Sequence, residues 1–157
     1  MYDPRRDLLF VEGALHFDVT FADQNIRINV HPGVKDPQQR ATQAAASISR
    51  LPRQMRNALR HVNILDGDGA AWEEGRGGFF TLYDGLMGRR LAEHDLDETV
   101  FHESAHVALD PMVYADPDWR SNQRADGAFI TEYAAEHPNK EDVAESALIA
   151  WALHKHP

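Results

Sequence analysis

Strand patterns precede helix patterns along this chain, and that order limits the fold more than any other feature of the sequence. Four segments alternate apolar and polar side chains or are rich in β-branched and aromatic residues, as strands are: residues 17–21, 26–30, 62–65 and 78–83. The first two flank a polar turn segment, so they predict a β-hairpin. Helical spacing of apolar residues dominates after residue 95. We therefore expect an α+β fold with an N-terminal mixed sheet.

Prolines and turn residues separate the predicted helices. Asp36-Pro37 is a typical helix start, and Pro52 interrupts the alanine-rich segment that follows it. The expected helices are residues 38–50, 53–61 and 128–136, one that Asp95 or Asp97 caps and that ends near Asp110-Pro111, and a last helix that Asn139 caps. A turn at Asp84-Gly85 is expected after the fourth strand, and residues 111–127 are expected to form a long loop.

The length and composition describe one globular domain. We expect residues 1–157 to form a single domain that is large enough to bury its own core. Cysteine is absent, which excludes disulfides, a thiol nucleophile and cysteine-ligated metal sites. No apolar run approaches the roughly 18 residues of a transmembrane helix, so no membrane partner is expected. The N-terminal residues lead into no signal-peptide core, which favours the cytoplasm, although a domain taken from an exported protein would have the same pattern.

Acidic residues are concentrated in the second half of the chain. Residues 1–78 hold ten acids and ten Lys or Arg, whereas residues 79–157 hold fifteen acids and six Lys or Arg, so the whole net charge of −9 lies there. A nucleic-acid-binding protein has the opposite bias, because Lys and Arg neutralise phosphates. Nucleic acid is therefore not an expected partner. The acidic half is either a solvated surface or a source of negative potential around a bound cation.

The segment His102-Glu-Ser-Ala-His106 is the most specific motif in the sequence. On a helix, residues four apart lie about 40° apart around the axis and one turn along it, so both imidazoles can share one metal ion. Glu103 lies beside them, where it can reach a water molecule at the metal without binding the ion itself. Imidazoles combined with a carboxylate suit zinc, so zinc is the expected cofactor. The competing interpretation is a chance motif on a structural helix, which predicts no metal.

Two imidazoles need a third ligand, and three carboxylates are candidates. The metzincin pattern is excluded, because Leu109 and Met112 stand where it needs Gly and then His or Asp. Asp110 follows the motif by one turn and could be a ligand, a hydrogen-bond partner of a ligand imidazole, or part of a helix end. Glu141 and Glu145 are four residues apart on the last helix, so one could bind the ion while the other accepts a hydrogen bond from a ligand imidazole.

A resemblance to a known family arises from three segments in order: the His102–His106 motif, Tyr133-Ala, and Pro138-Asn-Lys-Glu-Asp-Val-Ala-Glu145. This order resembles the zincin metallopeptidases of the gluzincin type. It is most similar to the small group related to the catalytic domain of anthrax lethal factor. The similarity covers about residues 98–151. It implies a small zincin-like domain with an active-site helix and a C-terminal helix that bears glutamates.

The resemblance also implies roles for individual residues. His102, His106 and Glu141 would bind zinc. Glu103 would be the general base that acts on a metal-activated water, and Tyr133 would polarise the substrate carbonyl. Glu145 would accept a hydrogen bond from a ligand imidazole.

The expected function is therefore that of a zinc-dependent metalloendopeptidase with a peptide or protein substrate. Residues 79–83 precede the metal helix and could form a sheet edge that pairs with an extended peptide. The alternative function is a zincin-like metal-binding domain with weak or no catalysis that acts as a protein-interaction module. Glu103 favours the enzyme, since a binding module has little need for a base between its ligands. The sequence leaves the oligomeric state open.

Overall fold

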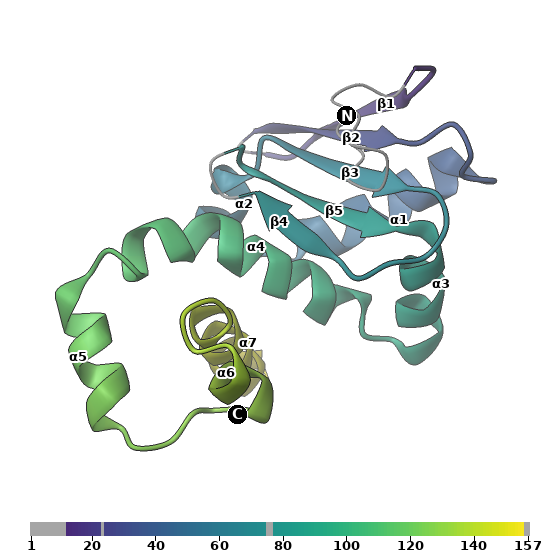
Figure 1. The fold of residues 1–157 in the computed structure, drawn as a ribbon. Helices are drawn as coiled ribbons and strands as arrows, with labels where there is room; N and C mark the ends of the chain where they lie inside the picture. Colours follow the sequence, from purple (N-terminus) through teal and green to yellow (C-terminus); the bar gives the residue numbers. More distant parts are fainter. Residues whose placement is uncertain (1–11, 23, 75–76, 156–157) are drawn as a thin grey trace.

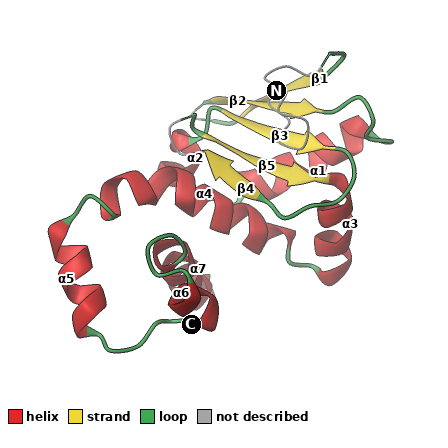
Figure 2. Cartoon of the chain, viewed as in Figure 1, coloured by secondary structure: helices red, strands yellow, loops and turns green. Residues whose placement is uncertain are grey.

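The computed structural model describes residues 12–22, 24–74 and 77–155. Within these residues the chain forms a five-stranded mixed sheet and seven helices, an α+β arrangement (Figures 1 and 2). The strands are β1 (Leu15–Thr20), β2 (Asn25–Val30), β3 (His61–Leu65), β4 (Trp72–Glu74) and β5 (Phe79–Tyr83). The helices are α1 (Pro37–Ser49), α2 (Arg53–Ala58), α3 (Asp84–Glu93), α4 (Leu96–Val113), α5 (Pro117–Ala125), α6 (Glu132–Glu136) and α7 (Asp142–Lys155).

The strand order in the sheet is β1-β2-β3-β5-β4. β1 and β2 form the predicted antiparallel hairpin, in which Leu15 lies opposite Val30. β2, β3 and β5 run parallel, and α1 and α2 provide the crossover between β2 and β3. β4 is antiparallel to β5, and Gly78 adopts a φ of 67° in the turn between them, a conformation that favours glycine.

The hydrophobic core joins the sheet to α1 and α4. Alternate residues of the three parallel strands are fully buried, among them Ile28, Val62 and Phe80. They belong to one cluster with Ile48 of α1 and Val100 of α4. Burial of each such side chain contributes roughly 1.5–3 kcal/mol relative to its exposure. The core therefore fixes the position of α4, the helix that carries the His-x-x-x-His motif.

The prediction that residues 79–83 form a sheet edge is wrong. β5 lies between β3 and β4, so both of its sides are paired. The edge strand on this side is β4, which sequence patterns did not reveal because three residues are too few to show alternation. β4 contacts α4, as Figure 1 shows. A strand edge therefore lies next to the helix with the metal motif.

Two helices occupy segments that were predicted to be a turn and a loop. α3 begins at Asp84, where a turn was expected, and it buries Leu86 and Met87. α5 occupies part of the predicted loop 111–127. Its cap is Asp116, whose carboxylate accepts a hydrogen bond from the Asp118 N–H at 2.9 Å, and its first residue is a proline. This is the same Asp-Pro start that predicted α1.

The metal-motif helix is longer than predicted. α4 passes through Pro111 and ends at Val113. A proline inside a helix removes one backbone hydrogen bond, and here the helix continues despite that loss. Asp95 precedes α4 at the expected capping position, but its side chain makes no cap and instead lies 2.6 Å from Arg90. No helix among the described residues combines the length and apolar character needed to cross a lipid bilayer.

The last two helices begin later than predicted. α6 starts at Glu132, where the Thr131 side chain caps it, and α7 starts at Asp142 rather than directly after Asn139. Residues 137–141 between them form a turn. α7 packs along α4, and Phe101 of α4 stacks on Trp151 of α7 with ring centroids 4.6 Å apart.

Candidate metal centre

α4 presents His102 and His106 on one side, as their spacing requires. The two rings lie edge to face with centroids 4.7 Å apart, and their Nε2 atoms are 3.1 Å apart. The His106 side chain is 3% exposed and that of His102 is 16% exposed. Both imidazoles are therefore held on a helix that is itself anchored in the core, and their nitrogens converge on one point.

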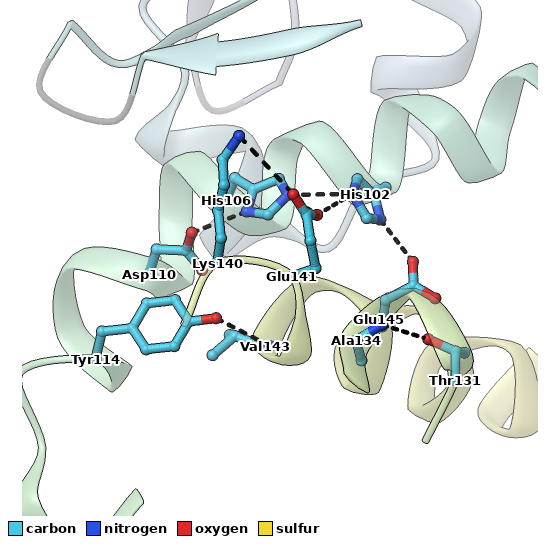
Figure 3. Close-up of polar contacts among 10 residues, drawn as sticks. All are labelled: His102, His106, Asp110, Tyr114, Thr131, Ala134, Lys140, Glu141, Val143 and Glu145. Carbon is cyan, nitrogen blue, oxygen red and sulfur yellow. Dashed lines mark hydrogen bonds and ion pairs between the residues drawn. The ribbon is translucent and has the colours of Figure 1, made fainter. Parts of the chain in front are cut away.

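Glu141 reaches this point from the turn before α7. Its Oε2 lies 3.2 Å from His102 Nε2 and 3.1 Å from His106 Nε2, as Figure 3 shows. Its backbone carbonyl accepts a hydrogen bond from the Glu145 N–H at 2.9 Å, so the turn leads directly into the helix. The ligand atoms of the three residues all lie within 4.8 Å of one another. This buried group could hold a metal ion.

Two further carboxylates contact the outer nitrogens of the same imidazoles. Glu145 Oε1 lies 3.1 Å from His102 Nδ1, and Asp110 Oδ2 lies 2.8 Å from His106 Nδ1. The contact of His106 with Asp110 is a hydrogen bond, and a carboxylate can only accept, so the His106 ring proton lies on Nδ1 and its Nε2 carries a lone pair. The contact of His102 with Glu145 is an ion-pair distance. A cation between the Glu141 carboxylate and the two Nε2 atoms would reduce the repulsion between these electron-rich atoms.

Burial and the neighbouring charges together shift the pKa values of the two imidazoles in opposite directions. Burial and the neighbouring His106 lower the pKa of His102, although Glu141 and Glu145 act against them. Burial also lowers the pKa of His106, but the hydrogen bond and the charge of Asp110 outweigh it and raise that pKa. His102 is therefore disposed to stay neutral, which is the state in which an imidazole binds a metal ion.

Glu103 lies on α4 between the two histidines and is 7% exposed. Burial is the main reason that its pKa rises to about 7, and the negative charges of Glu141 and Glu73 add to the effect. A carboxylate with a pKa near neutrality can both take up and release a proton. The site thus contains a group with the properties of a general base.

Tyr133 lies on α6, and its side chain lines the same cavity as His102 and Glu103. Its ring centroid is 6.5 Å from that of His102, and its side chain is 47% exposed. Burial, the charge of Glu141 and a side-chain hydrogen bond to Glu141 raise the pKa of its hydroxyl. The hydroxyl therefore remains protonated at neutral pH, the state in which it donates a hydrogen bond.

Side chains of α5 hold the turn that carries Glu141. Gln123 donates hydrogen bonds to the Pro138 carbonyl at 2.7 Å and to Asp142 Oδ2 at 2.8 Å. Arg120 donates to Asn139 Oδ1 at 2.8 Å. These contacts span both ends of the turn, so α5 positions the third member of the group. These contacts were not predicted from the sequence, because residues 111–127 were predicted to be a loop. The Asp116-Pro117 start of α5 was the signal that could have revealed the helix.

A cavity of about 330 Å³ opens beside His102 and Glu103, and we call it the side cavity. Residues of α3, α4, α6 and α7 line it, together with Ala70 and Ala71 before β4. α3, which begins where a turn was predicted, contributes Leu86 and Arg90 to the cavity. The neighbouring Arg89 lies outside the side cavity and pairs with Asp68 at 2.6 Å.

Comparison of this chain with protein-family models, curated proteins and solved structures found no match. The function must therefore be inferred from the geometry of the metal centre and its surroundings.

Proposed function

We propose that this chain is a zinc-dependent metalloendopeptidase with a zincin-type fold of the gluzincin kind, similar to the group related to anthrax lethal factor. One observation carries the proposal: His102, His106 and Glu141 converge, and each imidazole has a carboxylate on its outer nitrogen. Structural and catalytic zinc sites commonly have such carboxylate partners behind their histidines.

The donor set favours zinc as the ion. Zinc bonds of roughly 2.0–2.1 Å in a tetrahedral arrangement separate the ligand atoms by roughly 3.3 Å. The three ligand atoms here are 3.1, 3.1 and 3.2 Å apart. Three protein ligands also leave one position for water or substrate, as in catalytic rather than structural zinc sites. A zinc ion held there would supply Lewis-acid polarisation of a carbonyl and lower the pKa of water.

The chain's own residues would perform the proton transfers. Glu103 would accept a proton from the attacking water and later deliver it to the leaving amine, a role that fits its raised pKa. The Tyr133 hydroxyl would donate a hydrogen bond to the carbonyl oxygen as negative charge develops on it. The edge of β4, next to α4, would bind the peptide as an added strand.

Metal analysis combined with peptide cleavage tests the proposal. We expect one zinc per chain, cleavage of unstructured peptides, and loss of cleavage when a chelator removes the metal. Glu103→Gln should keep the zinc and lose cleavage by roughly 10²–10⁴-fold, the usual contribution of a general base. Glu136→Gln, an exposed glutamate of α6, is the matched control and should behave like the wild type.

Two results would contradict this function. Zinc binding by the wild type without cleavage of a diverse peptide library would favour a metal-binding interaction module instead. An absence of zinc after purification and reconstitution would exclude both functions and leave a chance motif.

A further inference from the structure

The side cavity has a strong excess of negative charge. Four carboxylates line it: Asp95, Glu98, Glu103 and Glu145. Arg90 is the one cation among its lining residues. The Arg90 Nη1 lies 2.6 Å from Asp95 and 3.6 Å from Glu93, so acids of the protein already offset its charge. The net charge of the wall therefore attracts cations and repels carboxylates and phosphates.

Two of the four carboxylates have no cation or donor of their own. Within the described residues, no Lys, Arg or His lies within ion-pair distance of Glu98, which is exposed at the cavity. Glu103 is more than nine-tenths buried, its side chain lines the cavity, and no described residue donates a hydrogen bond to its carboxylate. A carboxylate with little access to water is stabilised when a ligand supplies a donor. The proposed function assigns Glu103 to the attacking water, which leaves Glu98 as the free acceptor for a cationic group.

The rest of the wall suits an aliphatic chain. Leu86 and Leu148 line the side cavity, and so do Ala70, Ala71 and the side chain of Thr99. Lysine and arginine place their methylene stems along apolar surface and their charged ends among acceptors. The side cavity offers both kinds of surface, directly beside the metal centre.

We propose that the side cavity receives a lysine or arginine side chain of the peptide substrate, at a residue next to the cleaved bond. Glu98 determines this specificity by pairing with the cationic end, while the apolar wall contacts the stem. This proposal rests on the proposed peptidase function, and it names the class of peptide that the enzyme cleaves.

Cleavage of matched peptides tests the specificity. The zinc-loaded protein is given peptides that are identical except for one position, which holds lysine, norleucine or glutamate, and mass spectrometry locates the cleaved bonds. We expect cleavage next to lysine to exceed cleavage next to norleucine by about fivefold, the scale of one partly exposed ion pair, and cleavage next to glutamate to be slowest. Glu98→Gln should remove the advantage of lysine, whereas Glu136→Gln, the same change outside the cavity, should retain it.

Binding without turnover separates this proposal from the peptidase proposal. Calorimetry measures the binding of the blocked tripeptides Ala-Lys-Ala and Ala-Glu-Ala to the wild type, Glu98→Gln and Glu136→Gln. We expect the lysine peptide to bind more tightly, to lose about fivefold in affinity in Glu98→Gln alone, and to bind less tightly as salt rises.

The combined results of the binding and cleavage experiments show which of the two proposals fails. Selective binding of the lysine peptide without cleavage of any peptide would contradict the peptidase function and support the cavity's specificity. Cleavage with no preference for lysine, or with a preference that Glu98→Gln retains, would overturn the specificity and leave the peptidase function intact. Failure of both binding and cleavage would overturn both.

Discussion

The two sides of the candidate metal centre are built in different ways. On one side, α4 carries both histidines and buries its own apolar residues, such as Val100, Phe101 and Ala105, in the core. On the other side, Glu141 stands in a turn that polar contacts from α5 hold in place. Every residue of α5, all of which is described, is at least partly exposed.

Because of this difference, we expect different residues to control the stability of the fold and the affinity for the metal. Helix geometry and core burial fix the histidines, so their spacing changes only if the domain unfolds. The Glu141 turn has few buried apolar contacts and depends on individual hydrogen bonds, so it can open locally at a lower free energy than the whole domain. Substitutions of the buried apolar residues of α4 should therefore change mainly the stability of the fold, whereas those of polar residues that hold a ligand side chain or the Glu141 turn should change mainly the affinity for the metal.

The largest effect is expected in the core of α4. Phe101 is 3% exposed and stacks on Trp151, so Phe101→Ala should lower the free energy of unfolding by about 3–5 kcal/mol in urea titrations. Phe129, which is 37% exposed beyond α5, provides the control, and its replacement by alanine should cost about 0.5 kcal/mol. If both variants lost the same free energy of unfolding, the turn side would be as well packed as α4, and the proposed difference between the two sides would be wrong.

The carboxylate behind His106 should affect metal affinity more than stability. Asp110→Ala removes the acceptor 2.8 Å from His106 Nδ1, and we expect zinc to bind about 10–100-fold more weakly in competition with a chelating dye. Asp110→Asn keeps an acceptor without the charge and should lie between Asp110→Ala and the wild type. Asp126→Asn, an exposed position after α5, should leave the affinity unchanged. An affinity unaffected by Asp110→Ala would mean that this carboxylate does not orient the ligand.

The sequence could predict the α4 side because its determinants are local. The spacing of His102 and His106 fixes a shared helix face whatever the rest of the chain does. The alternation in β1 and β2 and the apolar spacing around Val100 are signals of the same local kind. The hairpin, the α+β order of elements and the metal helix therefore followed from patterns within a few residues.

The turn side could not be predicted, because long-range contacts determine it. The sequence offered Glu141, Glu145 and Asp110 as alternative third ligands, since spacing alone does not say which carboxylate faces the histidines. The structure separates them by packing α7 along α4, which places Glu141 at both Nε2 atoms and the other two carboxylates at the Nδ1 atoms. The edge position of β4 and the contacts of Gln123 likewise depend on partners far away in sequence.

Gln123 provides a direct test of the turn side. Gln123→Leu removes the hydrogen bonds to Pro138 O and Asp142, and we expect zinc affinity to fall about tenfold while the free energy of unfolding changes by about 1 kcal/mol. Ser121→Ala, at an exposed position of the same helix, is the control. The turn also has its own hydrogen bond, from the Glu141 N–H to His137 O at 2.8 Å. Unchanged affinity in Gln123→Leu would show that this internal bond and the contact of Arg120 with Asn139 suffice to position Glu141.

The smallest effect is expected at Tyr114, where α4 meets the turn side. The Val143 N–H donates to its hydroxyl at 3.5 Å, and burial is the main reason that its pKa rises to about 12. Because the folded state holds this proton more tightly than the unfolded state, with a pKa near 10, the contribution to stability is complete below pH 10 and declines as the pH rises from 10 to 12. Urea midpoints measured from pH 9 to pH 11 should therefore fall more steeply in the wild type than in Tyr114→Phe, which has no proton to lose there. Parallel slopes would mean that the Tyr114 hydroxyl is solvated in the folded state, and that the contact between α4 and the turn side is looser than its burial indicates.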